Sequence, residues 1–166
     1  SPTQVEDLYD DKALETAYAA ELKALLREKL QADDVAVFDF TRRSDDDTGA
    51  ANPDGNRGPA DRVHVDYTVD SGPKRAADAM GQELVDATLA SGGRIVQVNV
   101  WRPISGPVLR TPLALADAGS IAPSDLIPTD QRFPDRTGEI YHLSHVPEQR
   151  WYWAPLMSRD EVLLIK

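Results

Sequence analysis

The 166-residue chain contains no cysteine. This absence excludes disulfides, thiolate nucleophiles and sulfur-ligated zinc sites. Any metal ion must therefore be held by histidine, aspartate or glutamate side chains. Histidine is also scarce, because the whole chain has three. The search for a metal site therefore starts from His64, His142 and His145.

Long apolar runs are also lacking. No stretch approaches the ~20 apolar residues that a membrane span needs, and the chain does not start with a basic and then apolar signal. The 28 acidic residues outnumber the 18 basic ones, and a net charge of −10 repels phosphate backbones and anionic membrane surfaces. We therefore expect no nucleic-acid or membrane partner and a cytoplasmic location. Length and a hydrophobic content of 41% predict a single domain over residues 1–166.

Patterns in the first 60 residues predict a helix, a strand and a loop. Apolar side chains recur at helical spacing over residues 5–30, which indicates an amphipathic helix packed outside a barrel. Residues 35–40 are β-branched and aromatic, which is typical of a short strand. The tract 42–60 is rich in Gly, Pro, Asn and Asp and has no periodicity. Because this loop leads into the next strand, we expect it to close over a site as a lid.

The segment Arg62–Thr68 carries the main chemical signal, an imidazole and a carboxylate two positions apart in a predicted strand. Residues i and i+2 of a strand point to the same face, so His64 and Asp66 can approach one ion from the same side. We expect Val63 and Val65 to be buried on the opposite face. A mixed nitrogen and oxygen pair suits iron or zinc. The alternative is a strand histidine that is merely hydrogen-bonded to its neighbour.

The middle of the chain predicts a helix over residues 75–90, ended by a glycine pair, and then an alternating strand over residues 94–101. In this strand Ile95, Gln97 and Asn99 share one face, and three valines occupy the other. We expect the valine face to be buried. Buried amides need partners, so the amide face is expected to line a polar cavity or, alternatively, to meet solvent.

The remaining elements are short. Arg102, just beyond this strand, can clamp a carboxylate through its guanidinium or pair with one of the many acids of the chain. Residues 112–117 predict a strand, and residues 118–136 a loop with a helical turn, because three prolines prevent anything longer. Alternation over residues 139–146 and the aromatic segment 150–153 predict two strands joined as a hairpin.

Six short blocks resemble, in this order, one known family. The blocks are VHVDYT (63–68), VNVWRPISGP (98–107), PLALAD (112–117), GEIY (138–141), RWYWAP (150–155) and DEVLLIK (160–166). Together they are similar to the hydroxylase/desaturase family that includes cephem methoxylation proteins, gibberellin-desaturase-like proteins and fungal meroterpenoid oxygenases. The resemblance covers roughly residues 35 to 166, and its most specific part is VNVWRP.

The resemblance implies a mainly β fold with flanking helices, a double-stranded β-helix (jelly-roll, cupin-like) with its core over residues 62–166. It also implies an oxygenase that uses Fe(II), 2-oxoglutarate and O2 to hydroxylate or desaturate a small, largely apolar secondary metabolite. His64 and Asp66 would then be catalytic metal ligands, and Asn99 and Arg102 would contact the cosubstrate. Aromatic side chains are expected to contact the substrate: Tyr67, Trp101, Tyr141, Trp151 and Trp153. Whether the chain forms a homodimer is left open.

One departure from the family matters. The third metal ligand of the family, a His before Thr-Ala-Phe, and the Arg that holds 2-oxoglutarate both follow the block that matches DEVLLIK. We therefore expect the third ligand beyond Lys166 and the β-helix to be incomplete at the C-terminus. Two alternatives remain open. One is a non-catalytic β-barrel that binds or scaffolds with an incomplete metal triad; the other is a zinc hydrolase that uses His64, Asp66 and either His142 or His145.

Overall fold

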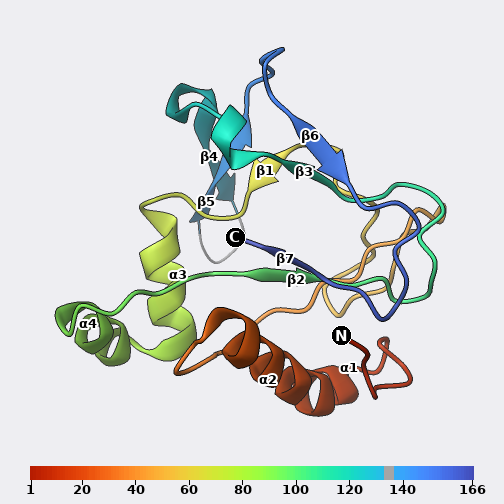
Figure 1. The fold of residues 1–166 in the computed structure, drawn as a ribbon, viewed down its shortest axis with the longest axis horizontal. Coiled ribbons are helices and arrows are strands. Elements are labelled where there is room, and N and C mark those ends of the chain that lie inside the picture. Colours follow the sequence, from red (N-terminus) through yellow and green to blue (C-terminus); the bar gives the residue numbers. More distant parts are fainter. Residues whose placement is uncertain (133–136) are drawn as a thin grey trace. The chain divides into compact units, whose positions relative to one another are not determined.

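A computed structural model describes residues 1–132 and 137–166. The chain forms two compact units. The first unit comprises Ser1–Pro59, Val96–Thr111 and Pro155–Lys166, and the second comprises Ala60–Ile95 and Pro112–Ala154. Helices and short antiparallel strands occur in both units (Figure 1). The predicted mixture of mainly β structure with helices is therefore confirmed. The single domain over residues 1–166 stays a prediction.

The N-terminal helix of the first unit begins at Asp11, later than the predicted start at residue 5. It runs through α1 (Asp11–Ala13), a π-helical stretch (Leu14–Tyr18) and α2 (Ala19–Leu30). The start is set by Asp10, whose carboxylate accepts hydrogen bonds from the first free N–H groups, those of Lys12 and Ala13. In the described part of the chain, no helix is long and apolar enough to cross a bilayer.

The core of the first unit gathers against this helix. Its buried side chains are Val5, Leu8, Leu14, Tyr18 and Leu22, and those packed against them include Val37, Phe40, Val100 and Ile104. Residues 35–40 form no strand, so that prediction is wrong. The β-branched and aromatic side chains of this segment signal apolar packing. The segment uses two of them to cover the helix instead of joining a backbone ladder.

One two-stranded ladder completes the first unit. β2 (Asn99–Trp101) pairs antiparallel with β7 (Leu163–Ile165), and Asn99 lies opposite Ile165. The strand predicted over residues 94–101 is thus much shorter than expected. Its valine face is only partly buried, because Val100 packs on the core whereas Val96 is 40% exposed.

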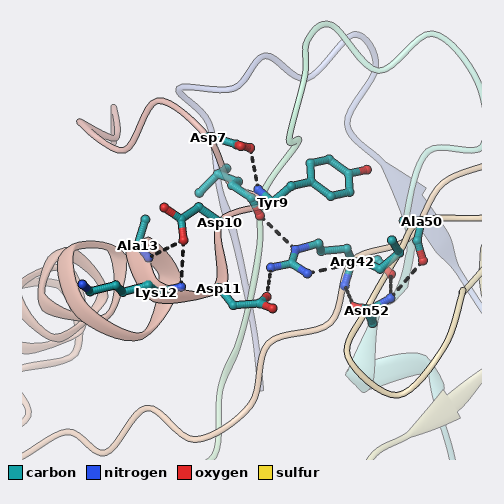
Figure 2. Close-up of polar contacts among 11 residues, drawn as sticks. Asp7, Tyr9, Asp10, Asp11, Lys12, Ala13, Arg42, Ala50 and Asn52 are labelled. Atoms are coloured by element: carbon teal, nitrogen blue, oxygen red, sulfur yellow. Dashed lines mark hydrogen bonds and ion pairs between the residues drawn. The ribbon is translucent and has the colours of Figure 1, made fainter.

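The loop predicted as a lid is fastened at its base to the N-terminal helix (Figure 2). Arg42 is 6% exposed, and its guanidinium donates to the Leu8 carbonyl at 2.9 Å and to the Asp11 carboxylate. The Asn52 side chain accepts from the Arg42 N–H at 2.7 Å and donates to the Arg42 carbonyl at 2.9 Å. A closing motion would therefore have to be confined to residues outside this anchor.

The second unit is built on a three-stranded antiparallel sheet in the order β1-β5-β4. Its strands are β1 (His64–Val65), β4 (Leu126–Arg132) and β5 (Thr137–Leu143). β4 lies where we expected only loop and a helical turn. The turn is present as 3-10 helices at Ala118–Ser120 and Pro123–Asp125, and residues 133–136 lie outside the described residues. Pro128 fits within β4 because β4 lies at an edge of the sheet.

The predicted hairpin of residues 139–146 with 150–153 is wrong. β5 pairs with β1 and β4, whereas β6 (Trp151–Trp153) pairs with β3 (Ala114–Ala116). The chain is turned away between β5 and β6. There the buried Gln149 donates to the Ser144 carbonyl at 2.8 Å, and the Ser144 N–H donates to the Asp125 carbonyl at 2.9 Å.

The helix predicted over residues 75–90 is two helices, α3 (Ser71–Met80) and α4 (Gln82–Ala90). The break falls at Gly81, whose φ of 88° lies in the region that only glycine adopts readily. α3 contacts β5 in the same unit. The helix start is therefore tied to the sheet that carries His64.

Candidate functional site

The predicted pair of residues is together in the second unit, at the short strand β1. His64 Nε2 lies 3.3 Å from Asp66 Oδ1, and the two side chains are 30% and 39% exposed. The two side chains lie together as expected, but Asp66 follows β1 in a bend and is not part of the strand. The predicted burial of the flanking valines is wrong, since Val63 and Val65 are 47% and 40% exposed. β1 is only two residues long, so too little strand is present to give it a covered apolar face.

The hydrogen bonding of His64 fixes which ring nitrogen faces Asp66. Its Nδ1 lies 2.7 Å from the Arg62 carbonyl, and since a carbonyl only accepts, Nδ1 carries the hydrogen. In the neutral ring, Nε2 then presents its lone pair toward the carboxylate oxygen of Asp66. Two electron-pair donors at this distance favour a cation or a proton between them.

The separation of these two atoms also fits a metal ion. Imidazole nitrogens and carboxylate oxygens lie about 2.1 Å from such ions, so two neighbouring ligands at angles of about 90–110° are about 3.0–3.4 Å apart. The observed 3.3 Å between Nε2 and Oδ1 lies within that range. A backbone carbonyl on the other ring nitrogen is also the usual second partner of a metal-binding histidine. His64 and Asp66 could therefore supply two ligands to one ion.

The other histidines differ in position. His142 lies directly opposite His64 in the β1–β5 ladder, so both project from the same face of the pair. The His142 Nδ1–H donates to the Val63 carbonyl at 3.2 Å. His145 follows the end of β5 and is exposed. Of the two, His142 is the one that the fold brings near the predicted pair.

Within residues 1–132 and 137–166, no three His, Asp or Glu side chains are grouped closely enough to hold a metal ion. Those residues therefore do not assemble the zinc-hydrolase set of His64, Asp66 and a second histidine. The expectation that the third ligand lies beyond Lys166 stays a prediction.

Three predicted substrate contacts belong to the second unit at β5 and β6. Tyr141 lies opposite Val65 in the β1–β5 ladder and is half-buried. On β6, Trp151 and Trp153 lie opposite Ala116 and Ala114, so the two indoles share one face of the β3–β6 ladder. Trp153 is 61% exposed. Small alanines opposite large indoles leave the aromatic faces accessible to an apolar ligand.

An ion pair holds the end of the same ladder. The Arg150 guanidinium donates to the Asp117 carboxylate at 2.7 and 3.1 Å. These hydrogen bonds, together with one from the Gly119 N–H, lower the pKa of Asp117, and the carboxylate in turn raises the pKa of Arg150. Arg150 is exposed and Asp117 partly exposed, so screening by solvent limits their contribution to stability. Their geometric effect is to fasten the residue before β6 to the residue after β3.

A fourth predicted substrate contact, the half-buried Tyr67, follows β1 in the second unit, and the remaining predicted site residues belong to the first unit. Asn99 and the half-buried Trp101 lie on β2, and Arg102 follows that strand. The Arg102 guanidinium donates to the Tyr18 hydroxyl at 2.9 Å, to the Ser1 carbonyl at 2.7 Å and to another carbonyl, and it lies over the Tyr18 ring. These acceptors are neutral, so Arg102 does not pair with an acid there. A cosubstrate clamp, which stays a prediction, would require part of this network to rearrange.

One group of polar residues beside the pair was not identified from the sequence. The buried hydroxyl of Thr68 is hydrogen-bonded to the Glu139 carboxylate of β5 and to the first residues of α3. A hydroxyl residue three positions before Ser71 is a typical helix-start pattern and could have indicated the capping half of this arrangement. No local pattern indicates the half that involves Glu139.

Comparisons with known proteins identify the family of the chain. The sequence profile of the oxidoreductase/YMDC permease-like domain family matches residues 1–166. The chain is 32% identical to the Fe(II)/2-oxoglutarate-dependent dioxygenase nvfI of Aspergillus novofumigatus, over 100% of this chain and 59% of that protein. It is 30% identical to the hydroxylase/desaturase efuI of Hormonema carpetanum, over 100% of this chain and 62% of that protein. The chain thus spans about three fifths of the length of these relatives.

A solved structure is also similar. The iron and alpha-ketoglutarate-dependent endoperoxidase NvfI superposes with a TM-score of 0.78 at 28% sequence identity, covering 95% of this chain and 57% of that one. Sequence profile, relatives and solved structure all indicate the same family as the residue blocks around His64. The chain belongs to the oxidoreductase/YMDC permease-like domain family and is similar to fungal Fe(II)/2-oxoglutarate-dependent dioxygenases and hydroxylase/desaturases.

Proposed function

We propose that the chain is part of an iron(II)/2-oxoglutarate-dependent oxygenase that hydroxylates or desaturates a small, largely apolar metabolite. The observation that carries this proposal is the pair formed by His64 Nε2 and Asp66 Oδ1, 3.3 Å apart beside β1. The relatives named above support the cosubstrate and the reaction class. The jelly-roll architecture belongs to the same proposal, as do the cytoplasmic location and the absence of a nucleic-acid partner.

In this proposal His64 and Asp66 hold Fe(II). When bound, iron with 2-oxoglutarate and O2 supplies the oxidising chemistry. The chain contributes orientation, because the Arg62 carbonyl keeps the hydrogen on Nδ1 of His64 and turns Nε2 toward Asp66. A carboxylate beside a neutral imidazole offsets one of the two positive charges of the ion.

Aromatic side chains of the same unit support the substrate class. Trp151 and Trp153 present indole faces from β6, and Tyr141 adds a ring from β5. Aromatic walls exclude water and bind apolar carbon skeletons through buried area. Tyr67 and Trp101 are proposed as further substrate contacts. Asn99 and Arg102 are proposed to contact 2-oxoglutarate.

Anaerobic titration with Fe(II) tests the metal site. We expect His64→Ala and Asp66→Ala each to weaken binding by at least ~10-fold, because each removes a direct ligand, and second-sphere losses alone reach 10–100-fold. His145→Ala serves as the matched control, since it removes an exposed imidazole beyond β5. The same variants are assayed for succinate formation from 2-oxoglutarate. Wild-type iron affinity in both ligand variants contradicts the proposal.

A further inference from the structure

Asp66 lies between two attachments to the same strand. On its N-terminal side, His64 and Val65 pair with His142 and Tyr141 of β5. On its C-terminal side, Thr68 reaches Glu139 of β5 through a hydrogen bond between side chains. The ladder itself ends at Val65, so the second attachment is made by side chains and not by the backbone. The position of Asp66 is therefore determined from both sides by β5.

Thr68 is the centre of the second attachment. The residue is 5% exposed, and its hydroxyl donates to the Glu139 carboxylate. The same oxygen accepts from the N–H groups of Asp70 at 3.2 Å and Ser71 at 3.0 Å. One hydroxyl thus joins the segment that leads from Asp66, the start of α3 and the side chain of a β5 residue. Because the hydroxyl both donates and accepts, valine cannot replace it.

Ser71 supplies a parallel connection from the first residue of α3. Its hydroxyl donates to the Glu139 carbonyl at 2.7 Å and accepts from the Thr68 N–H at 2.8 Å. The Thr68 carbonyl in turn accepts from the Gly72 N–H at 3.0 Å. The backbone and the side chain of Thr68 are therefore both fixed, and each fixes the segment to β5 or to the helix that contacts it.

We propose that Thr68, Ser71 and Glu139 form a positioning cluster that sets the Asp66 carboxylate at ligand distance from His64. The inference rests on the proposed metal role of His64 and Asp66. Asp66 is two residues from Thr68, so rotation of the chain at Thr68 would displace its carboxylate. A displacement of about 1 Å is enough to spoil a ligand site. The cluster holds a ligand that a two-residue strand alone would leave poorly fixed.

The test compares metal affinity with stability in four variants. Thr68→Val removes the hydroxyl at nearly constant size, Thr68→Ser keeps it, and Glu139→Gln keeps an oxygen acceptor without the charge. Ser120→Ala is the matched control, because its hydroxyl accepts from the Arg150 N–H at 2.9 Å in the same unit but away from β1. Co(II) serves as the probe, with affinity and d–d absorption as readouts, and thermal unfolding measures stability.

We expect Thr68→Val to weaken Co(II) binding about 10-fold and to change the d–d spectrum, as loss of outer-sphere support does in other metal sites. Thr68→Ser is expected to retain binding within about 3-fold. The affinity of Glu139→Gln is expected to lie between those of the two Thr68 variants, and Glu139→Gln takes the place of Thr68→Val in the test if Thr68→Val does not fold. Ser120→Ala should lower the melting temperature without changing affinity or spectrum. Wild-type affinity and spectrum in folded Thr68→Val or in Glu139→Gln overturn the positioning role. A wild-type chain that binds no better than His64→Ala overturns the proposed function instead.

Discussion

Replacement of Arg42 by methionine should destabilise the first unit far more than the same change at its neighbour Arg43. The Arg42 side chain is 7% exposed, and its Nε donates to the Leu8 carbonyl at 2.9 Å while a terminal nitrogen donates to the Ala51 carbonyl at 3.3 Å. Methionine preserves most of the aliphatic packing but leaves those carbonyls without their donor. The comparison therefore isolates the hydrogen bonds of the guanidinium.

The size of the effect follows from which contacts are buried. A hydrogen bond to a charged group contributes about 1.5–3 kcal/mol, and the long bond to Ala51 contributes the lower figure or less. The ion pair with Asp11 adds little, since that carboxylate is 56% exposed and exposed pairs contribute about 0–1 kcal/mol. We expect Arg42→Met to reduce the free energy of unfolding by about 2–4 kcal/mol.

Urea unfolding followed by circular dichroism measures this change through the helical signal of α1 and α2. Arg43→Met is the control, because Arg43 is exposed and makes one bond, to the Gly58 carbonyl at 2.9 Å. Its expected cost is below about 0.5 kcal/mol, as for ordinary surface changes. Equal costs for the two variants would refute the reasoning that burial of the Arg42 network determines its contribution.

Three other outcomes are expected. Hydrogen exchange over residues 42–60 should slow when 2-oxoglutarate and substrate are added anaerobically, whereas the paired N–H groups of Ala50 and Arg57 should be protected before the addition. Unchanged exchange at saturation would contradict a lid and make the segment an ordinary surface loop. Arg102→Gln should raise KM for 2-oxoglutarate if Arg102 is the clamp, and should lower stability at unchanged KM if it only joins Tyr18 to its neighbouring carbonyls. The pKa of Asp117 in the folded protein lies below the ordinary value of 3.8, so its carboxylate should stabilise the fold above pH 3.8 and lose this contribution as the pH falls through the folded pKa. Asp117→Asn should therefore make the stability of the protein depend less on pH in the acid range. The same acid pH dependence in the wild type and in Asp117→Asn contradicts the assignment.

Local patterns in the sequence predicted the elements better than their pairing. Apolar spacing located the helix that ends at Leu30, and Asp10 explains why it starts later than spacing alone suggests. β4 was missed because prolines usually exclude strands, although an outer strand tolerates Pro128. The partner of β6 was wrong because alternation shows that a strand exists but not which distant segment completes its ladder. Nearness in sequence favoured β5, and the turn held by Gln149 prevents that pairing.

The same difference between local patterns and distant pairing applies to the candidate site. His64 and Asp66 could be identified because they stand two positions apart, a spacing that puts two side chains on the same side of an extended segment. The support for Asp66 could not be identified, because Thr68 and Glu139 are 71 positions apart and meet only after β1 has paired with β5. A ligand motif read from sequence therefore specifies the donor atoms, whereas their distance from each other depends on contacts that form with the sheet. For this reason a change at Glu139, outside any motif for metal binding, is the sharper test of how the site is built.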